Sequence, residues 1–485
     1  MSLTLGDLFP EAGQAAGLSV TGLTADSRKV APGFVFLAVP GTAADGRLFA
    51  AKAAAAGAVA MVAQGERPAD LPEGVAYLSV PDARAALASA SARLHPRQPE
   101  TVVAVTGTSG KSSVADFVRQ IFGRLGREAA SLGTLGVITT SGAAYGSLTT
   151  PDPITLHRTL DRLSADGVTE LAMEASSHGI EQSRLDGVRL TAAGFTNLGH
   201  DHLDYHLTPE AYLQAKLRLF TTLLRADGTA VVNADGPRSG AVIAAVRERG
   251  LRLVTTGRAG EGIRLVSART EGFAQRLAIA VAGVTHTVDL PLVGAFQVEN
   301  ALVAAGLVLA TPAGAVREAE VIAALSHLAG VPGRLERVGT VRDALCIVDY
   351  AHKPDALANV LDALRAFTTG RLVCVVGCGG DRDRAKRPLM GRIATDKADR
   401  VIVTDDNPRS EDPATIRAAI LAAAPGAEEI GDRAEAIWAA VRDLRAGDVL
   451  LVAGKGHETG QIIGDRTLPF SDRDAVLSAI EETRA

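Results

Sequence analysis

Cysteine is scarce in this 485-residue chain, which has only Cys346, Cys374 and Cys378. Their number is odd, they all lie late in the chain, and their spacing matches neither a disulfide framework nor a zinc site. A reducing compartment fits this usage best. We therefore expect the three cysteines to be small apolar residues of a core.

The chain also lacks an excess of positive charge and a long apolar run. Its formal net charge of -5 provides no basic field for a polyphosphate backbone, so nucleic acid is not an expected partner. No apolar stretch approaches the roughly 20 residues that cross a bilayer, and the opening MSLTLGDLFPEAG has no basic segment before an apolar one. We expect a cytoplasmic protein without membrane insertion.

The length exceeds what one hydrophobic core accommodates and predicts about three domains. Two stretches with proline or glycine mark possible boundaries, LHPRQPE at residues 94–100 and AGVPGRLE at residues 329–336. The predicted domains are residues 1–98, residues 99–332 and residues 333–485.

The last of these domains alternates strands with helices. Its apolar segments LCIVDY, RLVCVVGCGG, RVIVTDDN and DVLLVAGKG are each followed by a polar or glycine-rich turn. Such alternation predicts a parallel sheet, in which ligands bind at the carboxyl ends of the strands. We expect Asp349, Gly377, Asp406 and Gly454 to share one rim of that sheet.

A glycine-rich loop, VTGTSGKSS at residues 105–113, follows the apolar strand Val102–Val105 and precedes a helical pattern. Its glycines allow close backbone approach to an anion, Lys111 supplies charge, and Ser112 supplies a hydroxyl for magnesium. The full P-loop pattern has glycine where Val105 stands, so the match is to a shortened loop. Nucleotide binding is favoured over a plain glycine turn.

Two clusters in the middle of the chain offer hard ligands for a divalent cation. The first, MEASSHG, contains Glu174 and His178. The second, NLGHDHLDYH, gathers His200, Asp201, His202, Asp204 and His206. Zinc is disfavoured because no cysteine is near, so magnesium with phosphate oxygens is the better candidate, against the alternative of a solvated loop. Helical periodicity gives Lys216, in AYLQAKLRLF, no role beyond that of a surface lysine.

These motifs occur with others in the order seen in Mur ligases, and the likeness spans nearly the whole chain. The motifs are GTSGKSS, LTTPD, MEASSHGI, FTNLGHDHLDYH, the lysine of QAKLRLF, FQVENALVAAG, PGRLE, VDYAHKPD, GCGGDRDRAKRP, DDNPR and GKGHE. Within the family the chain looks closest to UDP-N-acetylmuramoyl-tripeptide synthetases. The resemblance implies an α/β fold of three domains: a small N-terminal α/β domain, a central P-loop-type parallel-sheet ATPase domain and a C-terminal Rossmann-like domain.

The resemblance also assigns residues to ATP and metal. The ATP-binding set is Gly107, Thr108, Ser109, Gly110, Lys111, Ser112, Ser113, Asn300, Arg334, Asp349 and His352. The implied ligands of Mg²⁺ are Ser112, Glu174, His202 and Lys216, the last as a carbamate derived from CO₂. Lys111, Glu174, His202 and Lys216 form the implied catalytic set. Family members often have arginine where His200 stands.

The other two substrates implied by the family are UDP-N-acetylmuramoyl-L-alanyl-D-glutamate and meso-diaminopimelate. Residues implied for the UDP-substrate are Ala25, Ser27, Thr42, Ala43, Ala44, Thr149, Thr150, Ser176, Gln182 and Arg184. Those implied for diaminopimelate are Arg387, Asp406, Asn407, Pro408, Arg409, Gly454 and Glu458. Diaminopimelate differs from lysine by a second carboxylate at its far end. The guanidinium of Arg409 can bond both oxygens of that carboxylate, which favours diaminopimelate over lysine as the added amino acid. The alternative is a surface arginine after the turn residue Pro408.

The implied reaction belongs to peptidoglycan precursor synthesis. A carboxylate attacks the γ-phosphate of ATP, and the amine of diaminopimelate then attacks the resulting acyl phosphate. Two alternatives are disfavoured. The DDNPR and KRP motifs argue against another ligase on the same scaffold, such as a folylpolyglutamate or D-Ala-D-Ala-adding enzyme. A non-catalytic nucleotide-binding module is disfavoured because Lys111, Glu174, His202 and Lys216 are all present. We expect a monomer.

Overall fold

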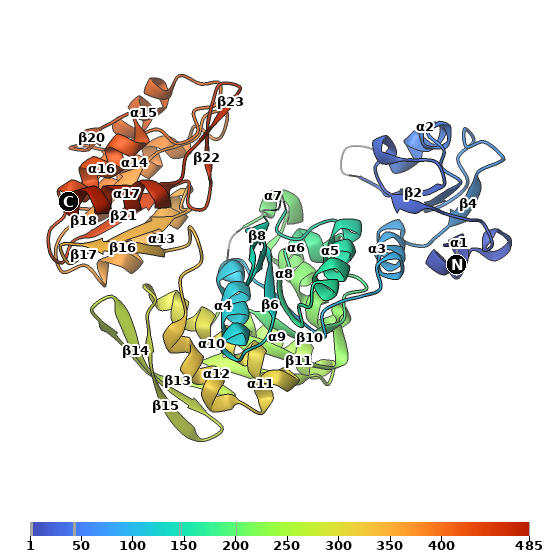
Figure 1. Ribbon diagram of the computed structural model, residues 1–485, viewed down its shortest axis with the longest axis horizontal. Helices are drawn as coiled ribbons and strands as arrows, with labels where there is room; N and C mark the ends of the chain where they lie inside the picture. Colours follow the sequence, from blue (N-terminus) through green and yellow to red (C-terminus); the bar gives the residue numbers. More distant parts are fainter. Residues whose placement is uncertain (1–2, 42–44, 145, 147, 200, 485) are drawn as a thin grey trace. The chain divides into compact units, whose positions relative to one another are not determined.

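The computed structural model describes residues 3–41, 45–144, 146, 148–199 and 201–484 (Figure 1). The chain forms two compact units. The first unit comprises Met1–Ile263 and Val303–Val321, and the second comprises Arg264–Leu302 and Ile322–Ala485. The chain passes between the units at three points, which lie in strand β13 (Ile263–Glu271) and in helices α10 (Ala295–Leu309) and α12 (Glu318–Ala324).

The first unit begins with a four-stranded parallel sheet in the order β1-β2-β3-β4. Along β2, Val35 and Leu37 enter one core and Phe36 and Ala38 enter another, because successive side chains of a strand face opposite sides. The strands are β1 (Gly22–Thr24), β2 (Phe34–Ala38), β3 (Ala60–Ala63) and β4 (Ala76–Ser79). The helices are α1 (Leu5–Leu8), α2 (Ala50–Ala55) and α3 (Ala83–Leu94), with 3₁₀ turns η1 (Gly13–Ala15), η2 (Ser27–Lys29) and η3 (Gly46–Phe49).

The larger sheet of the first unit has the order β12-β11-β10-β5-β9-β6-β7-β8. Its strands are β5 (Thr101–Thr106), β6 (Ala129–Gly133), β7 (Gly136–Thr139), β8 (Gly142–Ala144), β9 (Glu170–Glu174), β10 (Leu190–Phe195), β11 (Leu224–Asn233) and β12 (Arg252–Gly257). Strands β12 to β6 pair in parallel, whereas β7 and β8 pair antiparallel at one edge. Every residue of β5 is buried, as is typical of a parallel strand covered on both faces.

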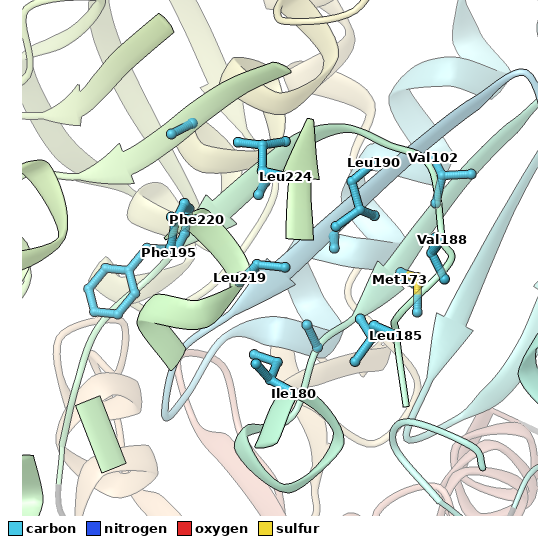
Figure 2. Close-up of a cluster of buried hydrophobic side chains, with 14 of the residues drawn as sticks. Val102, Met173, Ile180, Leu185, Val188, Leu190, Phe195, Leu219, Phe220 and Leu224 are labelled. Carbon is cyan, nitrogen blue, oxygen red and sulfur yellow. The ribbon is translucent and has the colours of Figure 1, made fainter. Parts of the chain in front are cut away.

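Helices pack against this sheet and build its core. The helices are α4 (Lys111–Arg124), α5 (Pro153–Ala165), α6 (Ser177–Glu181), α7 (Leu203–His206), α8 (Pro209–Arg218), α9 (Ser239–Glu248) and α11 (Pro312–Ala315), with a π-helical turn η4 (Leu219–Leu223). Figure 2 shows how Val102 and Leu190 from the strands meet Ile180 of α6 and Leu219 of η4. This core fixes the strand ends from which the candidate site is built.

The second unit contains a six-stranded sheet in the order β16-β17-β21-β18-β19-β20. The strands are β16 (Glu336–Val341), β17 (Ala344–Asp349), β18 (Leu372–Val376), β19 (Arg400–Val403), β20 (Glu428–Glu429) and β21 (Val449–Ala453). The parallel pairing from β17 to β20 confirms the predicted crossover sheet. Strand β16 is an antiparallel edge that the sequence pattern did not indicate.

Helices cover this sheet, and two hairpins accompany it. The helices are η5 (Leu325–His327), α13 (Pro354–Arg365), α14 (Lys386–Lys397), α15 (Pro413–Leu421), α16 (Arg433–Arg442) and α17 (Asp472–Arg484). Strands β14 (Ala274–Val281) and β15 (Val284–Leu290), which follow β13 (Ile263–Glu271), form one hairpin, and β22 (Gly460–Ile463) and β23 (Arg466–Pro469) form the other. Neither hairpin was predicted.

All three cysteines are buried and unpaired in the second unit, which confirms their expected role as apolar filling. Burial raises the pKa of the Cys346 and Cys374 thiols to about 12, so neither forms a thiolate at neutral pH. Among the residues described, no helix is long and apolar enough to cross a membrane.

Candidate active site

The predicted phosphate loop joins β5 to α4 in the first unit. Gly107 and Gly110 have φ angles of 153° and 88°, a region that favours glycine. A Cβ atom at Gly107 would overlap the Thr196 hydroxyl, so a larger residue does not fit there. Helix α4 begins at Lys111, and the backbone amides at the start of a helix suit an anion.

The loop is held in shape by the end of β10. The Thr108 amide donates to the Asn197 carbonyl at 2.9 Å, and the Ser109 amide donates to Asn197 Oδ1 at 3.1 Å. In return, Thr196 Oγ1 donates to the Ser109 carbonyl at 2.7 Å. A loop fixed in this way before a ligand arrives needs little reorganisation when phosphate binds.

Lys111 and Lys216 meet on one carbonyl of this loop. Each Nζ lies 2.9 Å from the Gly107 oxygen, and Lys111 also donates to the Thr108 oxygen at 2.9 Å. Lys216, from α8, is 1% exposed and lies 4.4 Å from the centre of the Tyr212 ring. Burial, with a smaller effect from the charge of Lys111, lowers the pKa of Lys216 to about 6. The interpretation of Lys216 as a surface lysine is therefore wrong.

Glu174 lies at the end of β9 and is 2% exposed. Its Oε1 accepts from the Thr134 amide at 2.8 Å and its Oε2 from the Thr134 hydroxyl at 3.3 Å. A small cavity between α4 and the ends of β6 and β9 is lined by Ser112, Gly133 and Glu174. A carboxylate and a hydroxyl at one cavity are the hard oxygen donors that Mg²⁺ prefers.

The His202 ring lies within a group of aromatic rings. Its ring centre is 4.8 Å from that of His178 on α6 and 6.2 Å from that of Tyr212 on α8. The Tyr212 hydroxyl in turn lies 3.3 Å from Thr108 Oγ1 on the phosphate loop. His202 has a φ of 54° and a side chain that is 44% exposed, so its ring remains accessible to a ligand.

The remaining members of the predicted metal cluster differ in position. His206 is buried, with Nε2 at 2.9 Å from Ser177 Oγ and Nδ1 at 3.1 Å from Glu181 Oε2, so both ring nitrogens are engaged. His200 and the side chain of Asp204 lie outside the described residues. Within the described part of the chain, no three His, Cys, Asp or Glu side chains are grouped to hold a metal ion.

The UDP-substrate candidates of the central sheet form one hydrogen-bonded group beside Glu174. Thr150 Oγ1 donates to the Glu174 carbonyl at 3.0 Å, and Ser176 Oγ lies 3.1 Å from that same hydroxyl. Arg184 donates to the Thr150 carbonyl at 2.7 Å and to Gln182 Oε1 at 2.7 Å. The hydroxyl of Thr149, which precedes Thr150, lies 2.9 Å from that of Thr134.

Of the five UDP-substrate candidates near the N-terminal sheet, the structure describes two. Ala25 is exposed and Ser27, at the start of η2, is buried; both follow β1. Thr42, Ala43 and Ala44 lie outside the described residues.

Three nucleotide candidates of the second unit gather around Tyr350. The Arg334 guanidinium lies 4.9 Å from the centre of the Tyr350 ring, and His352 Nδ1 lies 2.8 Å from the Tyr350 carbonyl. Asp349 Oδ2 accepts from the Leu335 amide at 2.7 Å, and burial raises the pKa of this carboxyl to about 6. Asn300, on α10, donates to Gln297 Oε1 at 2.9 Å.

The expected rim of the second sheet is confirmed. The Gly454 amide donates to the Asp349 carbonyl at 3.0 Å, and a Cβ at Gly454 would lie 2.6 Å from Asp406 Oδ2. A Cβ at Gly377 would lie 3.2 Å from the Asp406 amide. Four strand ends distant in sequence are thus neighbours.

Arg409 is half-buried on this rim and has a φ of 53°. Its amide donates to the Ile462 carbonyl of β22 at 3.0 Å, and its Nη1 donates to the Gly380 carbonyl at 2.8 Å. These contacts contradict the alternative of a free surface arginine. Arg387 is 2% exposed and forms a two-pronged ion pair with Glu411, at 2.9 and 3.1 Å, which orients the segment that follows Arg409.

A lysine that sequence reasoning did not single out lies among the diaminopimelate candidates. Lys455 is 0% exposed and bonds both Asn407 and Glu458. The signal was present, since Lys455 stands between two glycines in the GKGHE motif. Tyr212 and Asn197, which shape the phosphate loop, were also missed, although both lie in quoted motifs, Asn197 in FTNLGHDHLDYH and Tyr212 in AYLQAKLRLF.

Three family models match successive parts of the chain. The Mur ligase family catalytic domain matches residues 19–95, the Mur ligase middle domain matches residues 105–308, and the Mur ligase glutamate ligase domain matches residues 333–456. The chain belongs to the Mur ligase family. Its matched ranges include the phosphate loop, Glu174, Lys216 and the rim that carries Arg409.

Curated relatives of this Mur ligase are similar over almost their whole length. A UDP-N-acetylmuramoyl-L-alanyl-D-glutamate--2,6-diaminopimelate ligase of Bradyrhizobium diazoefficiens is 56% identical over 471 residues, covering 96% of each chain. One of the same name from Mesorhizobium japonicum is 56% identical over 484 residues, covering 99% of each chain. A solved structure of a ligase with this name superposes with a TM-score of 0.75 at 32% identity, covering 100% of both chains.

Proposed function

We propose that this Mur ligase joins meso-diaminopimelate to the D-glutamyl γ-carboxylate of UDP-N-acetylmuramoyl-L-alanyl-D-glutamate, with cleavage of ATP to ADP and phosphate, in bacterial peptidoglycan precursor synthesis. The proposal rests above all on the near-full-length likeness to relatives that bear this enzyme's name. The half-buried Arg409 on the rim of the second sheet supports diaminopimelate as the amino acid.

Activation of the carboxylate requires charge to be stabilised on phosphate. The loop amides at the start of α4 and the Lys111 ammonium are preorganised for the phosphates of ATP. The substrate carboxylate attacks the γ-phosphorus, the bond to the β-phosphate oxygen breaks, and ADP leaves with that electron pair. The product of this step is an acyl phosphate.

The cavity lined by Ser112 and Glu174 fits a divalent cation because both side chains offer oxygen donors. His202, with its accessible ring, would add a further ligand, and a carbamate on Lys216 would add an oxygen. Bound Mg²⁺ would supply positive charge to the phosphate oxygens. Glu174 is held ready for this by its two bonds from Thr134.

Lys216 is suited to carry a carbamate derived from CO₂. CO₂ adds to a neutral amine, and the pKa of about 6 leaves Lys216 mostly uncharged at neutral pH. A carbamate retains one N–H, which can still donate to the Gly107 carbonyl now bonded by Nζ. The modification would replace a neutral amine beside Lys111 with an anion that attracts metal.

In the second step the amine of diaminopimelate attacks the acyl carbon and phosphate departs, which forms the amide. Arg409 would bind the far-end carboxylate, and Glu458 the far-end ammonium. ATP and UDP-linked precursors are cytoplasmic compounds, so we place the enzyme in the cytoplasm; we expect it to act as a monomer.

The amino acid is tested by mixing the purified chain with ATP, the UDP-dipeptide and a panel of amino acids while phosphate release and product mass are measured. We expect meso-diaminopimelate to be used and lysine to be used poorly, because a site built for a carboxylate rejects an analogue without it. Arg409→Ala should lose most activity with diaminopimelate, whereas Arg392→Ala, at an exposed position of α14, should not. Efficient lysine addition by the wild type would overturn the choice of amino acid.

A further inference from the structure

Lys455 is a lysine with no exposed surface, in the turn that follows β21. Its Nζ donates to Asn407 Oδ1 at 3.0 Å and to Glu458 Oε2 at 3.1 Å. Removal of an ammonium from water is costly unless a partner of opposite charge and further hydrogen bonds compensate. The three side chains therefore act as a unit, which we call the Lys455 triad.

The triad determines which way the Asn407 amide faces. An ammonium can only donate hydrogen bonds, so Oδ1 must face Lys455, and the Ile462 amide reinforces this choice by donating to the same oxygen at 2.9 Å. Asn407 Nδ2 then donates to Glu458 Oε2 at 2.8 Å. A neutral residue at position 455 would remove the donor that orients both partners.

The triad also determines which carboxylate oxygen of Glu458 is available to a ligand. Its Oε2 receives two donors, whereas Oε1 has no recorded hydrogen bond within the described part of the chain. The Glu458 side chain is 32% exposed, so this oxygen is available to an incoming ammonium. Arg409 stands two residues after Asn407 and bonds Gly380 through Nη1, which leaves Nε and Nη2 of its fork for a carboxylate.

We propose that Lys455 is a positioning residue that makes this site select a zwitterionic far end over a cationic one. The inference rests on the proposed function. Its physical basis is charge: the far end of diaminopimelate carries a carboxylate and an ammonium and is neutral overall, whereas that of lysine carries a single positive charge. Lys455 offsets the negative charge of Glu458, and together with Arg409 it makes the site less favourable to a net cation.

The test compares wild type with Lys455→Met, which keeps the length of the side chain and removes its charge. We expect KM for meso-diaminopimelate to rise about tenfold or more with a smaller change in kcat, because a ground-state contact is lost. The ratio of kcat/KM for diaminopimelate to that for lysine should fall about tenfold, while KM for ATP stays the same. Lys397→Met, which removes a surface ion pair with Asp362 on the same domain, should change neither.

A second pair of variants decides whether Lys455 acts through Glu458. If it does, Lys455→Met combined with Glu458→Gln should be no worse for diaminopimelate than Glu458→Gln alone, because coupled effects do not add. The double variant buries no unpaired charge, so this comparison holds even if Lys455→Met alone fails to fold. An unchanged KM and selectivity ratio in Lys455→Met, or additive losses in the double variant, would overturn the inference. Failure of the wild type to add any amino acid would instead overturn the proposed function.

Discussion

Lys216 and Asp349 are buried ionisable residues of the candidate site, and their burial lowers the free energy of unfolding. Burial lowers the pKa of Lys216 to about 6 and raises the pKa of Asp349 to about 6, in each case because the charged form is poorly solvated. Strongly shifted groups with charged neighbours are typical of functional sites. Each shift also makes stability depend on pH in a direction that can be measured.

Lys216→Met should reduce ligation on the order of a hundredfold or more and should stabilise the fold. Between pH about 6 and 10.5 the unfolded wild type binds a proton at Lys216 that the native state does not, so wild-type stability rises with pH across this window. The gain from methionine is therefore largest at pH 6 and below, and it disappears toward pH 10.5. Denaturant unfolding at pH 6 and pH 9 measures it.

The same variant tests the carbamate. Added bicarbonate should not restore ligation by Lys216→Met, whereas short-chain carboxylic acids should restore part of it by supplying the missing anion. Lys52→Met, at an exposed position of α2, is the matched control. Near-normal turnover of Lys216→Met would show that the carbamate assignment is wrong.

Asp349→Asn should become increasingly more stable than wild type as the pH rises from about 4 to about 6. In that window native Asp349 holds a proton that the unfolded chain releases, so wild-type stability falls as pH rises, and asparagine does not show this loss. Asparagine keeps an acceptor for the Leu335 amide. The difference in free energy of unfolding should reach on the order of 1 kcal/mol above pH 6. A difference in free energy of unfolding that is constant with pH would contradict this.

At the scale of elements, the site depends on strands that end side by side. Strand β6 ends at Gly133 and β9 ends at Glu174, and parallel pairing aligns the two strands. A Cβ atom at Gly133 would overlap the Glu174 carboxylate. The glycine is required here for space, since it leaves room for a carboxylate that faces the cavity with Ser112.

Gly133→Ala should therefore displace Glu174, reduce ligation at least about tenfold and raise the Mg²⁺ concentration needed for half-maximal rate. Activity as a function of Mg²⁺, with far-UV circular dichroism to show that the fold is retained, is the measurement. Gly123→Ala in α4 is the matched control, because a Cβ there has no heavy atom within 4 Å. That substitution should leave activity unchanged and stabilise the chain by about 0.5–1 kcal/mol. Equal activities of the two variants would remove Glu174 from the mechanism.

At the scale of the whole molecule, residues expected to hold ATP occur in both compact units, whereas those expected to hold the UDP-substrate all occur in the first. The phosphate loop and the Thr150 group occupy different elements of that unit. Loss of a phosphate contact should therefore affect one ligand and spare the other.

Lys111→Met should weaken ATP binding and leave UDP-substrate binding almost intact. Calorimetric titration of each ligand separately measures both affinities. A loss of roughly a hundredfold for ATP is expected from removal of a charged contact to phosphate. Equal loss for both ligands would mean that the variant is misfolded or that the two sites share Lys111.

The family, the order of the motifs and most strands of the last domain can be predicted from the amino-acid sequence. Apolar runs followed by polar turns are local patterns, and the rule that parallel strands end at one edge predicts that Asp349, Asp406 and Gly454 lie together. The antiparallel strand β16 could not be predicted in the same way, because the direction of an edge strand depends on how it pairs rather than on its own residues.

Which charged side chains are buried, and which groups they bond, depends on the packing of the folded chain. Lys216 lies on a helix whose periodicity gave it no role, yet it bonds a carbonyl 109 residues away, and Lys455 bonds an amide 48 residues away. Burial and pKa arise from contacts between segments distant in the chain, so no local pattern contains them. Residue types therefore specify the chemistry that is available, and packing specifies which groups are placed to perform it.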